Sequence, residues 1–107
     1  MSYKTIELTE AENYLLIKVL EKRIYLGVTD VFSEELNDTL NKKFDKIYID
    51  LGNVSVMNSS GIGALIKARD EVTKKGKSVK LLHLQPLMQE IFTRMRLDTL
   101  FEIGDTL

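Results

Sequence analysis

Residues 46–65 read KIYIDLGNVSVMNSSGIGAL. The start of this stretch alternates between apolar and polar side chains, which predicts a strand over residues 46–51 with one face buried. A glycine and an asparagine then break the strand, and a short apolar run follows over residues 54–57. The turn-like polar cluster at residues 58–61 leads into apolar positions at helical spacing, which predict a helix from about 61 to 75. A buried strand that passes through a short turn into an amphipathic helix is typical of an α/β fold.

The rest of the chain continues this alternation of strands and helices. Asp30 or Ser33 is expected to cap the first helix, because both residue types accept hydrogen bonds from first-turn amides. Alternating elements require crossover connections, so the sequence predicts one α/β domain over residues 1–107. We expect a mixed β-sheet of about four to five strands, with about three to four helices mainly on one face. The predicted elements are strands at 3–8, 14–20 and 24–28, a helix along the apolar stripe from Phe32 to Phe44, a strand at 78–84, a helix from Pro86 to Met95 and a short strand at 101–103.

Composition limits the classes of partner. Lys and Arg together number 15 and Asp and Glu number 16, so the formal net charge of −1 gives no global attraction to nucleic acid or anionic lipid. The chain has no cysteine, which excludes disulfides, zinc–thiolate sites and cysteine nucleophiles and is typical of a reducing compartment. No apolar run approaches the length of a membrane span, and the N-terminal residues form no apolar signal region. We therefore expect a cytoplasmic protein with no nucleic-acid partner and no membrane insertion.

The sequence contains no recognisable catalytic or cofactor-binding pattern. His83 is the one histidine, and the sequence places no nucleophile or acid with it, so we interpret it as a strand residue. Asp50 ends a strand and is expected to stabilise the following loop. The spacing of Gly27, Gly61 and Gly63 matches neither a Walker nor a Rossmann phosphate-binding loop. The sequence therefore predicts a non-catalytic protein with no cofactor and no metal site.

The polar cluster at residues 58–61 lies at the start of the predicted second helix. The first backbone amides of a helix have no partner within it, and together with the helix dipole they favour a negative charge. A phosphate on Ser59 would add a charge of about −1.5 to −2, which the helix start tolerates and which changes the surface that a partner meets. Small polar residues are also common helix N-caps, so plain capping and a phosphorylation switch both fit the local pattern.

The same stretch resembles the signature of the STAS domain of anti-sigma factor antagonists. In that signature an apolar strand ends in Asp-Leu, a short apolar stretch follows, and Met-Asp-Ser-Ser/Thr-Gly-Leu-Gly leads into a helix. This chain has Asp50-Leu51 at the end of its strand and then Met57-Asn58-Ser59-Ser60-Gly61-Ile62-Gly63. Residues 30–36, 76–81 and 91–101 resemble three further segments of the family, so the similarity spans nearly the whole chain.

The resemblance implies a partner-switching function. The family residue that matches Ser59 is phosphorylated by an anti-sigma factor serine kinase, and the unmodified form binds that kinase and frees the sigma factor. A serine phosphatase of the metal-dependent type removes the phosphate. By this resemblance Ser59 is the phosphorylated residue, with Ser60 as the second choice. The implied partner-binding residues are Asp30, Asn58, Ser59, Ser60, Gly61 and Ile62.

Two features of the chain differ from the family pattern. Asn58 stands where the family usually has Asp, so a fixed negative charge beside the acceptor hydroxyl is missing. The segment before Asp30, residues 21–26, is a few residues longer than usual. These differences leave open a stand-alone STAS scaffold subunit of a transporter or signalling complex that binds without phosphorylation. A small enzyme or nucleotide-binding module is a third interpretation, which the missing catalytic patterns disfavour.

Overall fold

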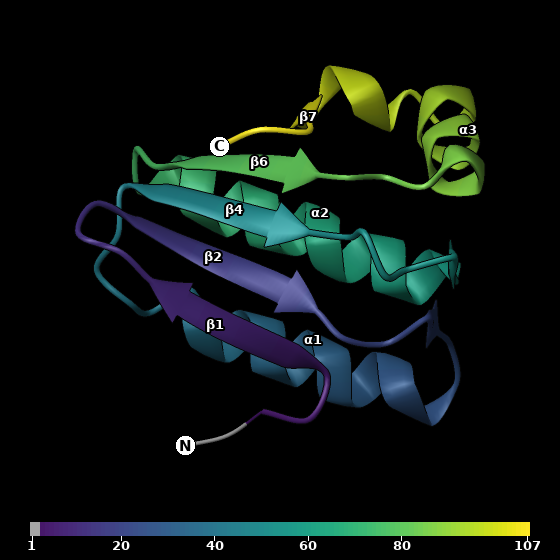
Figure 1. Ribbon diagram of the computed structural model, residues 1–107, viewed down its shortest axis with the longest axis horizontal. Helices are drawn as coiled ribbons and strands as arrows, with labels where there is room; N and C mark the ends of the chain where they lie inside the picture. Colours follow the sequence, from purple (N-terminus) through teal and green to yellow (C-terminus); the bar gives the residue numbers. More distant parts are fainter. Residues whose placement is uncertain (1–2) are drawn as a thin grey trace.

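The computed structural model describes residues 3–107, and its centre is a mixed five-stranded sheet. The strands, in their order across the sheet, are β1 (Ile6–Glu10), β2 (Tyr14–Val19), β4 (Lys46–Asp50), β6 (Ser78–Leu82) and β7 (Glu102–Gly104). β1 runs antiparallel to β2, and the other neighbouring pairs are parallel. The predicted mixed sheet of four to five strands is therefore confirmed (Figure 1).

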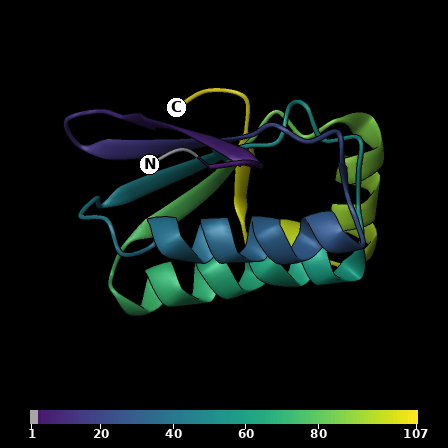
Figure 2. The ribbon, with the colours of Figure 1, turned by 90° about the horizontal axis from the view of Figure 1, so that it is seen from below.

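Two long helices cover one face of this sheet. α1 (Gly27–Thr39) and α2 (Ser59–Lys74) lie side by side against the strands, and both begin at the same end of the molecule (Figure 2). α3 (Pro86–Arg94) lies beyond the carboxyl ends of β4 and β6, and a short 3-10 helix (Leu97–Thr99) follows it (Figure 1). In residues 3–107 the opposite face of the sheet carries no helix, so the helices lie mainly on one face, as expected. Within the same residues, no helix has both the length and the apolar character needed to cross a bilayer.

The core forms where alternate strand residues meet the apolar sides of α1 and α2. Ile49 of β4 is buried and lies in register with Ile17 of β2 on one side and Leu81 of β6 on the other. Phe32 of α1 and Leu65 of α2 are buried in the same core. Full burial of one such side chain contributes about 1.5–3 kcal/mol. This layer therefore fixes the positions of both helices on the sheet.

A second, two-stranded ladder joins the segments that precede the two helices. β3 (Arg23–Ile24) and β5 (Val56–Met57) pair in parallel, with Ile24 opposite Met57. The amide of Asn58 donates to the carbonyl of Ile24 at 2.9 Å and so extends the pairing by one bond. β3 leads into α1 and β5 leads into α2, so this ladder brings the N-termini of both helices together.

The start of α1 differs from the prediction. The expected strand over residues 24–28 ends at Ile24, because the chain turns at Leu26, where φ is 47°. The next amides bond back across this turn, and the helix begins at once. Asp30 therefore lies inside the first turn of α1, and no side chain caps the helix, so the expected cap by Asp30 or Ser33 is wrong.

The ends of the helices agree with some sequence signals and differ from others. Gly76, with φ 75°, follows the last residues of α2, and Pro86 occupies the first turn of α3, as predicted. The apolar stripe of the first helix continues to Phe44, but α1 itself ends at Thr39. Met95, the last residue of the third predicted helix, is the C-cap of α3 and is 50% exposed.

Candidate functional site

The start of α2 is set by Asn58. Its backbone is extended, with φ −75° and ψ 171°, and its side-chain Oδ1 accepts a hydrogen bond from the Gly61 amide at 2.8 Å. Its carbonyl accepts the first helical bond, from the Ile62 amide at 3.0 Å. This is the geometry of an asparagine N-cap, so the capping interpretation holds for residue 58.

Ser59 and Ser60 occupy the first turn of α2, and both are exposed. Because Asn58 makes the cap, the helix start does not depend on either serine hydroxyl. The first turn contains no acidic side chain, and the free amides and the helix dipole favour a negative charge there. An accessible hydroxyl therefore lies where the helix itself would stabilise an added phosphate.

Gly61 is buried where α2 meets the β3–β5 ladder. A Cβ atom on this residue would lie 2.5 Å from Cγ of Met57 and 2.9 Å from Cγ2 of Ile24. These contacts are too short for a close-packed interior, so any larger residue would push the ladder away. The neighbouring Ile62 is 4% exposed and packs in the core. Gly61 and Ile62 therefore hold the helix start in place and present no side chain at the surface.

Thr29 connects the start of α1 to the same cap. It is 5% exposed, and its hydroxyl donates to Oδ1 of Asn58 at 3.3 Å. One oxygen atom thus accepts hydrogen bonds from the first turns of both helices. The sequence did not reveal this role, because a threonine before Asp30 carries no local signal of a contact across the fold.

Asp30 is exposed in the first turn of α1. It lines a shallow pocket of about 360 Å³ between α1 and α2, together with Glu34 and Lys67. Since both helices begin at the same end of the molecule, Asp30 and Ser59 belong to the same end (Figure 2). The structure therefore places the exposed members of the implied binding set, Asp30, Ser59 and Ser60, at the same end of the molecule, and Asn58 links the two helices there.

The turn before α1 adds two exposed apolar side chains to this end. Tyr25 is 45% exposed and Leu26 is 78% exposed, and both line a pocket of about 670 Å³ with the charged residues 21–23. Leu26 has φ 47° and ψ −131°, a conformation that residues with a Cβ rarely adopt. The sequence missed this feature because the segment reads as a continuing strand.

Comparison with known proteins assigns the fold to a family. The sequence model of the STAS domain matches residues 5–107. The chain belongs to the STAS domain family. The resemblance seen in the sequence is thereby confirmed, and so is the expected fold.

Solved structures with the same fold come from two classes of protein. This STAS domain is similar to an anti-sigma factor antagonist from Mycobacterium paratuberculosis, at 16% identity over 96% of this chain and 86% of that chain, with a TM-score of 0.84. It is similar to the phosphorylated form of the Bacillus cell fate determinant SpoIIAA, at 16% identity over 92% of this chain and 89% of that chain, with a TM-score of 0.69. It is also similar to a sulfate transporter family protein from Wolinella succinogenes, at 15% identity over 92% of this chain and 82% of that chain, with a TM-score of 0.75. At these identities the similarity shows a shared fold.

A second polar cluster of the STAS domain lies where β4 and β6 end. Nδ1 of His83 lies 3.2 Å from Oδ1 of Asp50, and Nε2 lies 2.9 Å from the carbonyl oxygen of Asp105. The hydrogen bond with Asp50 is the main reason that the pKa of His83 is raised above its usual 6.5. Oδ1 of Asp50 also accepts from the Gly52 amide at 2.8 Å, which confirms that this aspartate stabilises the following loop.

His83 itself lies directly after β6, in a left-handed conformation with φ 61°, so the interpretation as a strand residue is wrong by one position. Both ring nitrogens are engaged, one by Asp50 and one by the backbone of the C-terminal segment. This cluster therefore ties the segment after β7 to the sheet.

Proposed function

We propose that this STAS domain is an anti-sigma factor antagonist that acts by partner switching. In its unmodified form it binds an anti-sigma factor serine kinase and frees the sigma factor, and phosphorylation of Ser59 ends that binding. The observation that carries the proposal is the exposed position of Ser59 in the first turn of α2, at the end of the molecule that also exposes Tyr25 and Leu26. Membership of the STAS family and the similarity in fold to an anti-sigma factor antagonist support this function.

Phosphorylation of Ser59 changes the surface without opposing the fold. The phosphate adds a charge of about −1.5 to −2 at a helix N-terminus, where the dipole and the free amides favour it. A partner that covers this position must remove water from the dianion, which is unfavourable unless the partner supplies matching cations. The modified domain therefore stays folded and binds the kinase more weakly.

The proposed docking surface combines apolar and polar contacts at the end where α1 and α2 begin. The two exposed apolar side chains supply the area that anchors a protein interface, and the carboxylate of Asp30 supplies a contact for a cationic group. Asn58, Gly61 and Ile62 contribute by fixing the start of α2. The exposed members of the surface are Tyr25, Leu26, Asp30, Ser59 and Ser60.

The STAS domain performs no catalysis in this cycle and needs no cofactor. The hydroxyl oxygen of Ser59 attacks the γ-phosphorus of ATP bound to the kinase, ADP leaves, and the hydroxyl proton passes to a base of the kinase. A serine phosphatase of the metal-dependent type then hydrolyses the phosphate and restores the binding form. Ser60, one position further along the same turn, is the second choice of acceptor. We place the cycle in the cytoplasm, where the kinase finds ATP.

A scaffold function is the second candidate. Asn58 carries no charge, and its Oδ1 is already occupied by Gly61 and Thr29, so no carboxylate lies next to Ser59 in the chain to orient its hydroxyl. The fold similarity to a sulfate transporter family protein supports the same alternative. In that function the same surface binds a transporter or signalling partner constitutively, and Ser59 stays unmodified.

The test incubates the purified protein with each anti-sigma factor serine kinase encoded in the same genome, with and without Mg²⁺ and ATP. We expect a complex in the absence of ATP and, in its presence, a phosphate that mass spectrometry locates on Ser59. Ser59→Ala should bind and remain unmodified, whereas the matched control Ser60→Ala should still accept phosphate on Ser59. A complex that persists with no phosphate would favour the scaffold, and absence of both complex and phosphate would overturn the proposal.

A further inference from the structure

β1 is an edge strand with one open side. It pairs with β2 only, and the end of the sheet on its other side is free (Figure 1). At one end of the ladder the amide of Leu20 donates to the carbonyl of Thr5, and at the other end the amide of Ala11 donates to the carbonyl of Tyr14. In an antiparallel pair, alternate residues exchange bonds with the partner strand. The backbone groups of Glu7 and Thr9 therefore face β2, together with the carbonyl of Thr5 and the amide of Ala11.

The backbone groups of Ile6, Leu8 and Glu10 consequently point to the open side. Within residues 3–107, no backbone hydrogen bond outside the β1–β2 ladder reaches these three residues. The strand contains no proline and pairs with β2 in continuous register, so no bulge interrupts its edge. An edge of this kind is a template on which another extended chain can pair.

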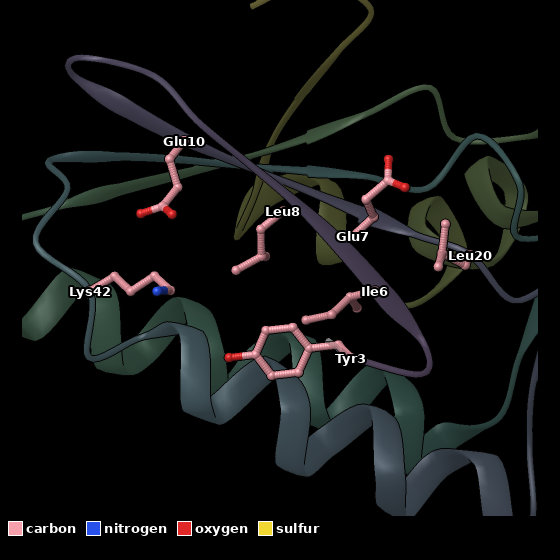
Figure 3. Close-up of a pocket in the computed structure, with 7 residues that line it drawn as sticks. All are labelled: Tyr3, Ile6, Glu7, Leu8, Glu10, Leu20 and Lys42. Carbon is pink, nitrogen blue, oxygen red and sulfur yellow. The ribbon is translucent and has the colours of Figure 1, made fainter. Parts of the chain in front are cut away.

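A groove of about 460 Å³ runs along this edge, between β1 and the end of α1 (Figure 3). In Figure 3 the side chains of Ile6 and Leu8 point toward α1, where Tyr3 and Lys42 lie, and Glu7 points the other way. The groove therefore has an apolar floor on the helix side of the sheet. A strand added to the edge would place every second side chain over that floor.

Glu35 of α1 fixes the chain segment at one end of the groove. Its carboxylate accepts hydrogen bonds from the amides of Lys4 and Thr5 and from the hydroxyl of Thr5. The hydroxyl of Tyr3 donates to Asp38 one turn further along the helix. The segment before β1 is thus already ordered, and a strand that pairs with the edge need not order it on binding.

The charges along the groove favour a basic partner segment over a second copy of this chain. Glu7 and Glu10 line it with a single cation, Lys42, while Lys18 lies opposite Glu7 on the neighbouring strand. A second copy of this chain would bring two further glutamates to the same edge, and like charges on adjacent strands repel. A basic side chain placed beside Glu7 meets an opposite charge instead.

We propose that the open edge of β1 binds an extended segment of a partner protein in which apolar residues alternate with lysine or arginine. The segment adds a strand to the sheet and pairs its backbone with Ile6, Leu8 and Glu10. Its apolar side chains lie over Ile6 and Leu8 in the groove, and its basic side chains lie on the opposite face beside Glu7. This site uses none of the residues at the start of α2.

The first experiment uses a short capped peptide of alternating valine and lysine as the probe. Amide hydrogen exchange of the full chain, followed by NMR, should show new protection at Ile6, Leu8 and Glu10. The amides of Glu7 and Thr9 already face β2 and should change little. Protection at no β1 amide, or only at other elements, would overturn the proposal.

Control peptides separate strand addition from general attraction of charges. A peptide with glutamate in place of lysine tests the charge, and a peptide with the same lysines and valines in two blocks tests the alternation. Each should bind at least about tenfold more weakly than the probe. Equal binding of either control would contradict an alternating basic strand. Sedimentation of the protein alone tests whether a second copy of the chain binds at this edge. A dimer in which the amides of Ile6, Leu8 and Glu10 are protected would overturn the proposal of a basic partner segment.

A pair of matched variants locates the binding on the protein. Glu7→Lys should weaken binding of the probe by about tenfold, because the carboxylate beside the basic side chains becomes a cation. Glu34→Lys makes the same change in net charge at an exposed position of α1 and should bind the probe as the wild type does. Equal weakening in both variants would show that net charge alone drives the binding, which would contradict the assignment to β1.

Discussion

The hydroxyl of Thr29 donates to Oδ1 of Asn58 at 3.3 Å, and the same oxygen accepts from the Gly61 amide at 2.8 Å. One side-chain atom therefore joins the first turns of α1 and α2. Thr29 also donates its amide to the carbonyl of Leu26, so its bond to Asn58 is connected to the turn before α1. The bond from the Gly61 amide fixes the first turn of α2. This shared acceptor thus acts together with the β3–β5 ladder in fixing the position of the proposed apolar contact relative to Ser59.

Removing that acceptor should destabilise the protein. Asn58→Ala leaves the Gly61 amide without a cap and the buried Thr29 hydroxyl without a partner, so we expect a loss of about 1–2 kcal/mol in the free energy of unfolding. Urea denaturation measures it. Asn53→Ala, in an exposed turn, is the control and should change stability by less than about 0.5 kcal/mol.

The variant Asn58→Asp tests the same cap with a charged acceptor. A carboxylate keeps both hydrogen bonds and adds negative charge at a helix N-terminus, so the variant should be at least as stable as the wild type. A clear loss of stability would contradict the geometry described for the cap. If the missing carboxylate limits the reaction at Ser59, the same variant should also be phosphorylated faster by its kinase.

The two glycines of the first turns of α2 should respond to alanine in opposite directions. Gly61→Ala places a methyl group against Met57 and Ile24 and should cost about 1–3 kcal/mol. Gly63→Ala meets no atom within 4 Å and should stabilise the protein by about 0.5–1 kcal/mol, because alanine favours the helix. Thermal and urea unfolding of both variants provide the comparison. A neutral Gly61→Ala would show that the ladder moves aside easily.

The carboxylate of Glu35 should make stability depend on acidity. Burial raises the pKa of this carboxyl, but the hydrogen bonds from Thr5 and Lys4 outweigh burial and lower the pKa below its usual 4.5. A lowered folded-state pKa contributes stability that is present above the usual value and is lost as the pH falls through the folded value. Glu35→Gln should therefore lose about 1–2 kcal/mol near neutral pH and show a shallower fall in acid. Glu34→Gln, exposed on the same helix, is the control, and an acid profile of Glu35→Gln identical to the wild type would refute the argument.

His83 should titrate above an ordinary histidine. Its hydrogen bond with Asp50 raises its pKa above 6.5, so its contribution to stability is present below that value and is lost as the pH rises through the folded pKa. His83 is the one histidine in the chain, so its NMR titration is assigned without ambiguity. Asp50→Asn should return the pKa toward its usual value. No change in that variant would contradict the pairing.

Binding to the proposed kinase should tolerate loss of the Ser59 hydroxyl better than gain of a negative charge at this position. Ser59→Ala should bind the proposed kinase with nearly unchanged affinity, whereas Ser59→Asp should bind more weakly because the carboxylate must be desolvated at the interface. Calorimetry of both variants against the same kinase measures the difference. Equal affinities would count against the switch.

Much of the fold could be predicted because its elements are long and periodic. The alternation around Ile49 and the spacing of Leu65 with its apolar neighbours on α2 identify a strand and a helix, and Gly76 and Pro86 mark helix boundaries through backbone constraints that act locally. The family signature around Ser59 depends on the same local order of strand, turn and helix. These signals need no knowledge of what packs against them.

The missed features depend on contacts between distant segments. β3 and β5 are two residues long, too short for any periodicity, and they exist because they pair with each other. Gly61 belongs to the family motif, but only the fold shows that the side chains of Ile24 and Met57 pack against it. Thr29 is important through an oxygen 29 positions away in the chain. The accessibility of Ser59 agrees with the sequence interpretation, and its phosphorylation stays a prediction.

The turn at Leu26 has a thermodynamic consequence for any complex formed there. Hydrogen bonds close the turn and hold its backbone in one conformation, and the Leu26 side chain projects from it into water. Covering it would release hydration water without immobilising a loop. Calorimetry of such a complex should therefore record a negative change in heat capacity on association, with the conformational entropy of this turn already lost when the chain folded.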